Sequence, residues 1–193
     1  MRLPVLFTLV FSAVTAHAQQ DIWSHVKPQF DLPTLASATL SDARQAAVRR
    51  LLRQNKTSIG WECEGDDALN EMLKGLTYKN IPLSDAQPVL LVEADAGCAR
   101  GGQGSNGAMW LVRFDADTPV LMATPKGGFD GWLFSIEPSS SHGYRDIILG
   151  WHMGASEGGL NYFRFDGKTY RGIGSASYTV GDDDHLKIVP NPK

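Results

Sequence analysis

The sequence predicts an α+β fold that is mainly antiparallel β: a hairpin-wired sheet with one N-terminal helix packed on it. Three observations support this prediction. One long amphipathic stretch lies near the start of the chain, at 41–55. Eight short apolar or aromatic segments follow it, each bounded by Gly, Pro, Asp or Ser. No helix-length segment separates these eight, so neighbouring strands should pair as antiparallel hairpins.

The first 18 residues, MRLPVLFTLVFSAVTAHA, have the pattern of a secretory signal peptide. One arginine precedes an apolar run, and Ala16 and Ala18 match the small-residue pattern of a cleavage site. The run is too short to cross a bilayer as a retained helix. We therefore expect cleavage near Ala18, a periplasmic or secreted mature protein, and no membrane span.

Residues 19–40 contain two prolines and no clean hydrophobic period, so they are expected to form an extended N-terminal arm. Residues 41–193 should fold as a single β-rich domain that begins with the helix. The mature chain is long enough to form one domain with a substantial hydrophobic core, and too short for two domains of ordinary size.

Ser41 is the expected N-cap of the helix, and Asp42 places an acidic side chain in its first turn. Val48 and Leu52 belong to an apolar stripe with helical spacing. This stripe predicts that one face of the helix packs on the sheet. A second, shorter helix is expected near 67–74.

The strand segments are rich in branched and aromatic residues and are separated by short turns. Such spacing is typical of a meandering sheet. The expected strands are 88–95, 108–115, 118–124, 131–137, 144–151, 160–166, 168–174 and 185–189.

The chain has two cysteines, Cys63 and Cys98. An oxidising compartment favours pairing them, so we expect one disulfide that stabilises the fold. The alternative, free thiols with a catalytic or metal-binding role, has less support because no second ligand lies at a typical spacing from either cysteine.

The tripeptide Arg-Phe-Asp occurs twice, as Arg113 to Asp115 and as Arg164 to Asp166. Strand alternation directs each phenylalanine toward the core and the charged residues to the other face. Asp166 and Gly167 together predict a type I′ turn. The Arg and Asp side chains are either solvated cross-strand ion pairs or candidate binding residues of a recognition surface.

The segment GASEG at 154–158 matches the GxSxG pattern of serine hydrolases, which makes Ser156 a candidate nucleophile. Asp183 and His185 follow it in a chain order that suits a triad, and His152 is an alternative base. The pattern requires a helix after the serine, however, and GLNYFRFD reads as a strand. We therefore assign no catalytic residue, and leave open whether the protein is an enzyme, with the balance against it.

The same segment is expected to be a turn between two antiparallel strands. In this interpretation, Gly154 to Gly159 connects Tyr144 to Trp151 with Leu160 to Asp166. Gly158 and Gly159 would allow positive φ angles that a side chain would disfavour.

Residues 102–107 match the GxGxxG pattern and follow an expected strand. A dinucleotide site needs a helix to begin there, so that its amides meet the pyrophosphate. A strand follows instead, and a flexible loop is the simpler interpretation. We therefore expect no cofactor.

His142, Asp146 and His152 have the even spacing that places side chains on one face of a strand. Ten residues of strand extend roughly 33 Å, so the two histidines are too far apart to share one metal ion. The acidic cluster at 181–184 lacks the regular spacing of a calcium loop. No metal site is expected.

The stretches GYRDIILG and YFRFDGKTY resemble the C-terminal part of small uncharacterised secreted proteins from Gram-negative bacteria. They are also similar to repeats of the FG-GAP or VCBS type, in which a Gly-x-x-Asp segment leads into a strand. The resemblance covers residues 105–175. The first group implies no activity, and neither calcium binding nor a propeller is carried over.

These observations together favour a non-catalytic binding protein, inhibitor-like or immunity-like, that uses a β-sheet surface. The partner would be a protein or a cell-wall component. Nucleic acid is excluded by a net charge of −3 with scattered basic residues. The alternatives are a secreted serine hydrolase that uses Ser156 and a carbohydrate-binding module with exposed aromatic rings.

Overall fold

The computed structural model describes residues 22–27, 31–56, 63, 65–94, 97–99, 106–181, 183 and 185–192. Within these ranges it has a nine-stranded antiparallel sheet with two helices, and the predicted α+β fold is confirmed. The expected signal peptide lies outside the described residues. None of the described helices is long and apolar enough to cross a membrane.

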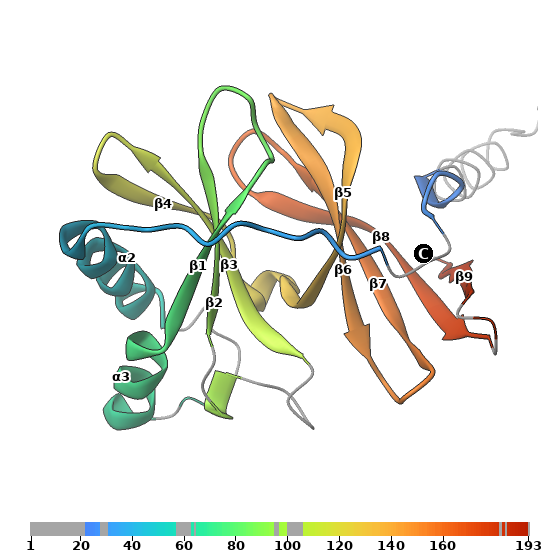
Figure 1. The fold of residues 1–193 in the computed structure, drawn as a ribbon, viewed down its shortest axis with the longest axis horizontal. Helices are drawn as coiled ribbons and strands as arrows, with labels where there is room; N and C mark the ends of the chain where they lie inside the picture. Colours follow the sequence, from blue (N-terminus) through green and yellow to red (C-terminus); the bar gives the residue numbers. More distant parts are fainter. Residues whose placement is uncertain are drawn as a thin grey trace, which may run out of the picture.

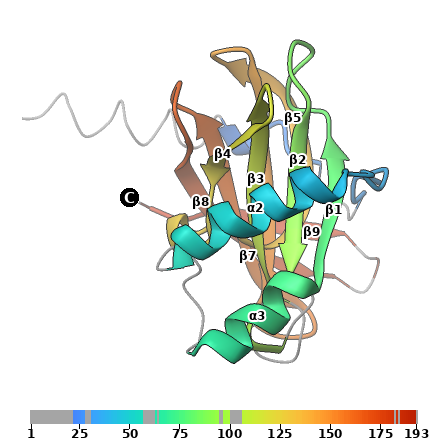
Figure 2. The same cartoon turned by 90° about the vertical axis from the view of Figure 1, so that its left-hand side faces the viewer.

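Both predicted helices are present, as α2 (Asp42–Gln54) and α3 (Asp66–Lys74). Ser41 is the N-cap of α2, and its hydroxyl accepts a hydrogen bond from the Arg44 amide at 3.4 Å. Figure 2 shows both helices lying across one face of the sheet. Their buried residues, including Val48 and Leu52, pack on outward-facing residues of the first strands.

Eight of the nine strands correspond to the eight expected segments, although several begin or end at different residues. The strand before 88–95 was not predicted, because polar residues interrupt its apolar pattern. The eighth strand continues six residues beyond its expected end. The strands are β1 (Leu76–Ile81), β2 (Val89–Ala94), β3 (Gly107–Asp115), β4 (Thr118–Ala123), β5 (Asp130–Ser141), β6 (Tyr144–His152), β7 (Glu157–Phe165), β8 (Tyr170–Val180) and β9 (Leu186–Pro190).

The sheet order is β1-β2-β3-β5-β6-β7-β8-β9, with β4 paired to β3. The junction of β3 with β5 is short, at Gly107↔Gly131 and Ala108↔Asp130. The sheet therefore divides into two halves, β1–β4 and β5–β9, which Figure 1 shows side by side.

The central core lies between the inward faces of these two halves. Leu91 and Leu111 come from the first half, and Ile147, Leu149 and Phe163 from the second; all five are at most 2% exposed. We call this side of the second half its inner face. Two further apolar clusters cover the outer faces: one beneath α2 and α3, and the other on β5–β9.

The N-terminal segment is only partly extended. Residues 31–40 run along β1, where Ser37 bridges Lys79 and the Ala38 amide donates to the Tyr78 carbonyl at 2.8 Å. Ile22 to Val26, in contrast, form a short helical turn. The reason is Trp23, which is buried on the outer face and meets the Tyr162 ring edge-on at 5.9 Å.

The hairpin of β6 and β7 confirms the predicted pairing, with Ile147 opposite Phe163 and Trp151 opposite Gly159. The role expected for Gly158 and Gly159 is wrong, however. Both lie inside β7, and neither has a positive φ. A Cβ at Gly159 would overlap the Trp151 ring, and one at Gly158 would overlap the Tyr178 hydroxyl. Glycine is needed at these two positions because aromatic side chains from the neighbouring strands lie directly against the β7 backbone, one on each face.

The turn at Asp166 also differs from the prediction. A type I′ turn needs two consecutive positive φ angles, and only Gly167 has one, at 96°. The Asp166 carboxylate instead accepts the Lys168 and Thr169 amides at 2.8 and 2.7 Å, which closes a longer loop. Two consecutive positive φ angles occur between β5 and β6, at His142 (51°) and Gly143 (78°).

Candidate functional site

Ser156 lies exposed in the loop between β6 and β7, and the chain continues into a strand. Its carbonyl accepts the Val180 amide at 2.8 Å, which ties the loop to the end of β8. His152 is engaged elsewhere: its Nδ1 lies 3.1 Å from the Tyr178 hydroxyl and its ring stacks on Trp132. Within the described part of the chain, no hydrogen bond joins the Ser156 hydroxyl to a histidine.

The other triad candidates lie together in the turn before β9. The Asp183 carboxylate accepts the His185 amide at 3.2 Å, so this contact involves the backbone and not the imidazole. Of the acidic cluster, Asp182 and Asp184 lie outside the described residues, as does 101–105 of the glycine-rich loop. Among described residues, no group of three His, Cys, Asp or Glu side chains is placed to hold a metal ion.

Cys63 and Cys98 form the predicted disulfide, with a Cα–Cα distance of 5.0 Å. Cys98 belongs to a short 3₁₀ helix, Gly97–Ala99, that follows β2. The bond therefore ties the segment before α3 to the end of the sheet beneath it. Such a bond fits an oxidising compartment.

The four candidate binding residues do not form one recognition surface. Arg113 contacts Asp115 at 3.3 Å and also donates to the Tyr144 hydroxyl. Asp166 pairs with Arg171 at 3.1 Å. Arg164 does not pair with Asp166, which lies beyond the end of β7.

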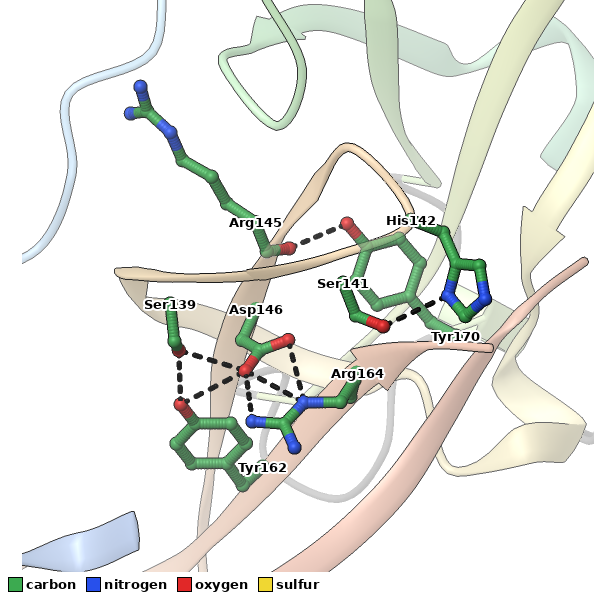
Figure 3. Close-up of polar contacts among 8 residues, drawn as sticks. All are labelled: Ser139, Ser141, His142, Arg145, Asp146, Tyr162, Arg164 and Tyr170. Carbon is green, nitrogen blue, oxygen red and sulfur yellow. Dashed lines mark hydrogen bonds and ion pairs between the residues drawn. The ribbon is translucent and has the colours of Figure 1, made fainter. Parts of the chain in front are cut away.

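Arg164 pairs instead with Asp146, which is 0% exposed (Figure 3). The register that pairs Ile147 with Phe163 places Asp146 opposite Arg164 on the outer face. The guanidinium donates to the carboxylate through Nη2 at 2.7 Å and Nε at 3.0 Å. These hydrogen bonds raise the pKa of Arg164.

Two hydroxyls complete this network. Ser139 donates to Asp146 at 2.8 Å and lies 2.9 Å from the Tyr162 hydroxyl, which donates to the same carboxylate at 3.4 Å. Burial raises the pKa of Tyr162. Each carboxylate oxygen is thus satisfied by protein groups. The network stabilises the hairpin and leaves no acceptor of Asp146 directed toward a ligand.

A pocket of about 350 Å³ lies at the open end of the second half of the sheet. We call it the inner-face pocket. Strand alternation and register place Trp151, Asn161 and Ser175 on the same face as the core residue Leu149. The pocket is lined by Asn106, Asp130, Trp151, Leu160, Asn161, Ser175, Ala176 and Asn191.

The inner face remains open here because the central core stops short of the last strands. The central core includes Tyr170 at the start of β8 but no residue of β9. Further along β8, Ser177 is exposed, and so is its cross-strand partner Val189, at 51%. Figure 1 shows β8 and β9 at the end of the molecule opposite α2 and α3.

Local contacts hold the lining residues in place. The Trp151 ring lies against the backbone of β7 at Gly159, where only a glycine leaves room for it. Asn106 pairs with the main chain of His152 through both amide atoms, at 3.0 and 3.2 Å. Asn191 donates through its backbone amide to the Ser175 carbonyl at 2.9 Å and through its side chain to the Ser175 hydroxyl at 3.2 Å.

Asp130 is the one ionisable residue among the described residues of the lining, and it lies at the junction of β3 and β5. Burial raises its pKa, and a hydrogen bond from its own backbone amide partly offsets this effect. The pocket therefore presents amides, a hydroxyl and a carboxyl group beside an indole ring. This set of described residues can donate and accept hydrogen bonds, and it includes no basic side chain.

Sequence reasoning did not find this pocket. The signal that could have indicated it is Asn161, a polar residue on the inward-facing side of a strand whose next inward residue, Phe163, is in the core. Ser175 and Ser177 are likewise polar residues on the inward-facing side of the neighbouring strand. Register was needed to place them beside Trp151.

No protein-family model, curated protein or solved structure matches this chain. The resemblance of residues 105–175 to FG-GAP or VCBS repeats stays a prediction.

Proposed function

We propose that this chain is a periplasmic or secreted, non-catalytic binding protein, inhibitor-like or immunity-like, that recognises its partner with the inner-face pocket of the sheet. The observation that carries the proposal is a polar, concave surface on the face of the sheet that elsewhere forms the core. Asn161 lines it, and the hydrogen bonds of the described residues do not engage its side-chain amide. Concave sites with a few convergent polar groups are the usual form of a binding pocket.

The compartment is proposed from the leader pattern and from the disulfide, which would persist where the environment is oxidising. The partner would be a protein or a cell-wall component of the same compartment. The exposed inner face of β8 and β9 continues from the pocket, so a partner larger than the pocket could extend across it.

Partner capture tests this proposal. The mature protein would be immobilised and exposed to isolated cell-wall sacculi and to periplasmic extract, beside the variant Asn161→Arg. An arginine at this position would fill the pocket and add a charge. Thr118→Arg is the matched control, because Thr118 is an exposed strand residue in the other half of the sheet.

We expect the wild type and Thr118→Arg to retain the same partner and Asn161→Arg to lose it, with all three equally stable in thermal melts. Retention of the partner by Asn161→Arg would contradict the proposal, because binding would then take place on another surface.

A further inference from the structure

We infer that the inner-face pocket binds a neutral oligosaccharide. This inference rests on the proposed function, because it assigns a ligand class to the same pocket. It follows from three properties of the pocket: its charge, the pattern of its polar groups, and the position of its aromatic ring.

The charge of the described part of the lining disfavours an anionic ligand. Among the residues that the structure describes, Asp130 is the only ionisable one that lines the pocket. A phosphate or carboxylate would meet no cation among these residues and would lie beside a carboxyl group, which costs desolvation without compensation. A neutral ligand avoids this cost.

The polar groups suit a ligand that carries hydroxyls. Asn161 offers an amide donor and a carbonyl acceptor that no hydrogen bond among the described residues engages, and the Ser175 hydroxyl, which accepts from Asn191, can still donate. A hydroxyl group both donates and accepts, so neighbouring sugar hydroxyls can satisfy such a mixed set in pairs. A ligand with acceptors only, or donors only, would leave part of this set unsatisfied at a cost.

The aromatic ring suits the apolar side of a sugar. Trp151 is held by its contact with Gly159, so little conformational entropy is lost when a ligand packs on it. The C–H groups on one face of a pyranose carry a weak positive charge, and the face of an indole ring carries a negative one. The ring and the Asn161 amide are presented by adjacent strands, as stacking and hydroxyl recognition of one sugar would require.

The size of the pocket and its open side indicate a chain longer than one sugar. About 350 Å³ is near the lower limit of ligand pockets, roughly 300 to 1,000 Å³. Beyond it, Ser177 and Val189 are exposed on the same face. Further sugars could therefore extend along β8 and β9.

Calorimetric titration with defined oligosaccharides tests the inference. The neutral probes are cellotetraose, xylotetraose, mannotetraose, maltotetraose and tetra-N-acetylchitotetraose, and tetragalacturonate is the anionic comparison. We expect at least one neutral probe to bind and tetragalacturonate not to bind. Asn161→Ala should weaken binding about tenfold, as for the loss of one well-placed hydrogen bond. Trp151→Leu should abolish it, while Thr118→Ala should have no effect.

A second readout separates loss of the site from loss of the fold. Amide chemical shifts of β7 and β8 in each variant should match those of the wild type outside the pocket. If Trp151→Leu does not fold, Asn161→Ala alone decides the question. Binding that is unchanged in Asn161→Ala would overturn the inference.

The results also distinguish this inference from the proposed function. If no neutral oligosaccharide binds while a protein is captured through a surface that Asn161→Arg blocks, the ligand class is wrong and the binding function stands. Binding of tetragalacturonate alone would likewise refute the neutral ligand. If neither sugar nor partner binding depends on the pocket, both proposals fail.

Discussion

Replacing Arg164 with Met should destabilise the protein more than replacing its partner Asp146 with Asn. Asp146 is fully buried, whereas the side chain of Arg164 is 42% exposed. Removing Arg164 leaves a carboxylate inside the protein without its cation. Removing the charge of Asp146 leaves a guanidinium that can turn toward water, which is a much smaller penalty.

The magnitudes follow from the contacts of the pair. Removing one partner of a buried ion pair costs about 3 to 5 kcal/mol. Asp146 would keep its hydrogen bonds from Ser139 at 2.8 Å and Tyr162 at 3.4 Å. Arg164→Met should therefore fall at the lower end, about 3 kcal/mol. Asp146→Asn keeps the shape and one acceptor, and should cost about 1 to 2 kcal/mol.

The double variant Asp146→Asn, Arg164→Met has no buried charge. It should be more stable than Arg164→Met alone by about 1 kcal/mol. The interaction energy, which is the cost of the double variant minus the costs of both single variants, is then about −2 to −3 kcal/mol, within the range for residues in contact. Urea unfolding of the oxidised protein measures all three. Arg171→Met is the matched control, because it breaks an ion pair whose side chains are 68% and 40% exposed; this should cost less than about 1 kcal/mol. The reasoning is refuted if Arg164→Met costs no more than Arg171→Met, or if the two single effects simply add.

Three further predictions concern the disulfide, the β6–β7 hairpin and the Asp166 loop. Reducing the disulfide, or Cys63→Ser, should lower the free energy of unfolding by about 2 to 5 kcal/mol without changing the far-ultraviolet circular dichroism; two free thiols in protein purified from the periplasm would contradict this. Ser156→Ala should change stability by less than about 0.5 kcal/mol, whereas Phe163→Ala, at 2% exposure, should cost about 3 to 5 kcal/mol; chemical unfolding of both variants would show the reverse order if the loop were a strained active site. Two backbone amides lower the pKa of Asp166 from 3.8 to about 2, so its stabilising effect is complete above about pH 5 and is lost as the pH falls toward 2. Asp166→Ala should therefore lower the melting temperature at pH 7 and show a smaller further loss between pH 4 and pH 2 than the wild type, and parallel pH profiles would count against this assignment.

Local patterns were enough for much of this fold. The α2 helix could be predicted because its cap at Ser41 and its apolar stripe depend only on residues within the segment. The β6–β7 hairpin could be predicted because its strands are joined by a short loop, so their pairing is local in sequence. The disulfide followed from the number of cysteines, since two cysteines in one chain allow a single intramolecular bond.

The partner of each polar side chain was decided only by the tertiary structure. Alternation predicts which face of a strand carries Arg164, but register decides that its neighbour is Asp146 and not Asp166. Gly159 has the appearance of a turn residue in the sequence, and its actual role depends on a ring that crosses from the adjacent strand.

The inner-face pocket depends on tertiary structure even more. Its lining comes from segments as far apart as Asn106 and Asn191, and no local pattern connects them. Sequence periodicity determined that Asn161 faces the same side as the core residue Phe163. Only the tertiary structure decided that the central core ends before β9, so that this polar residue lines a pocket and is not part of the core.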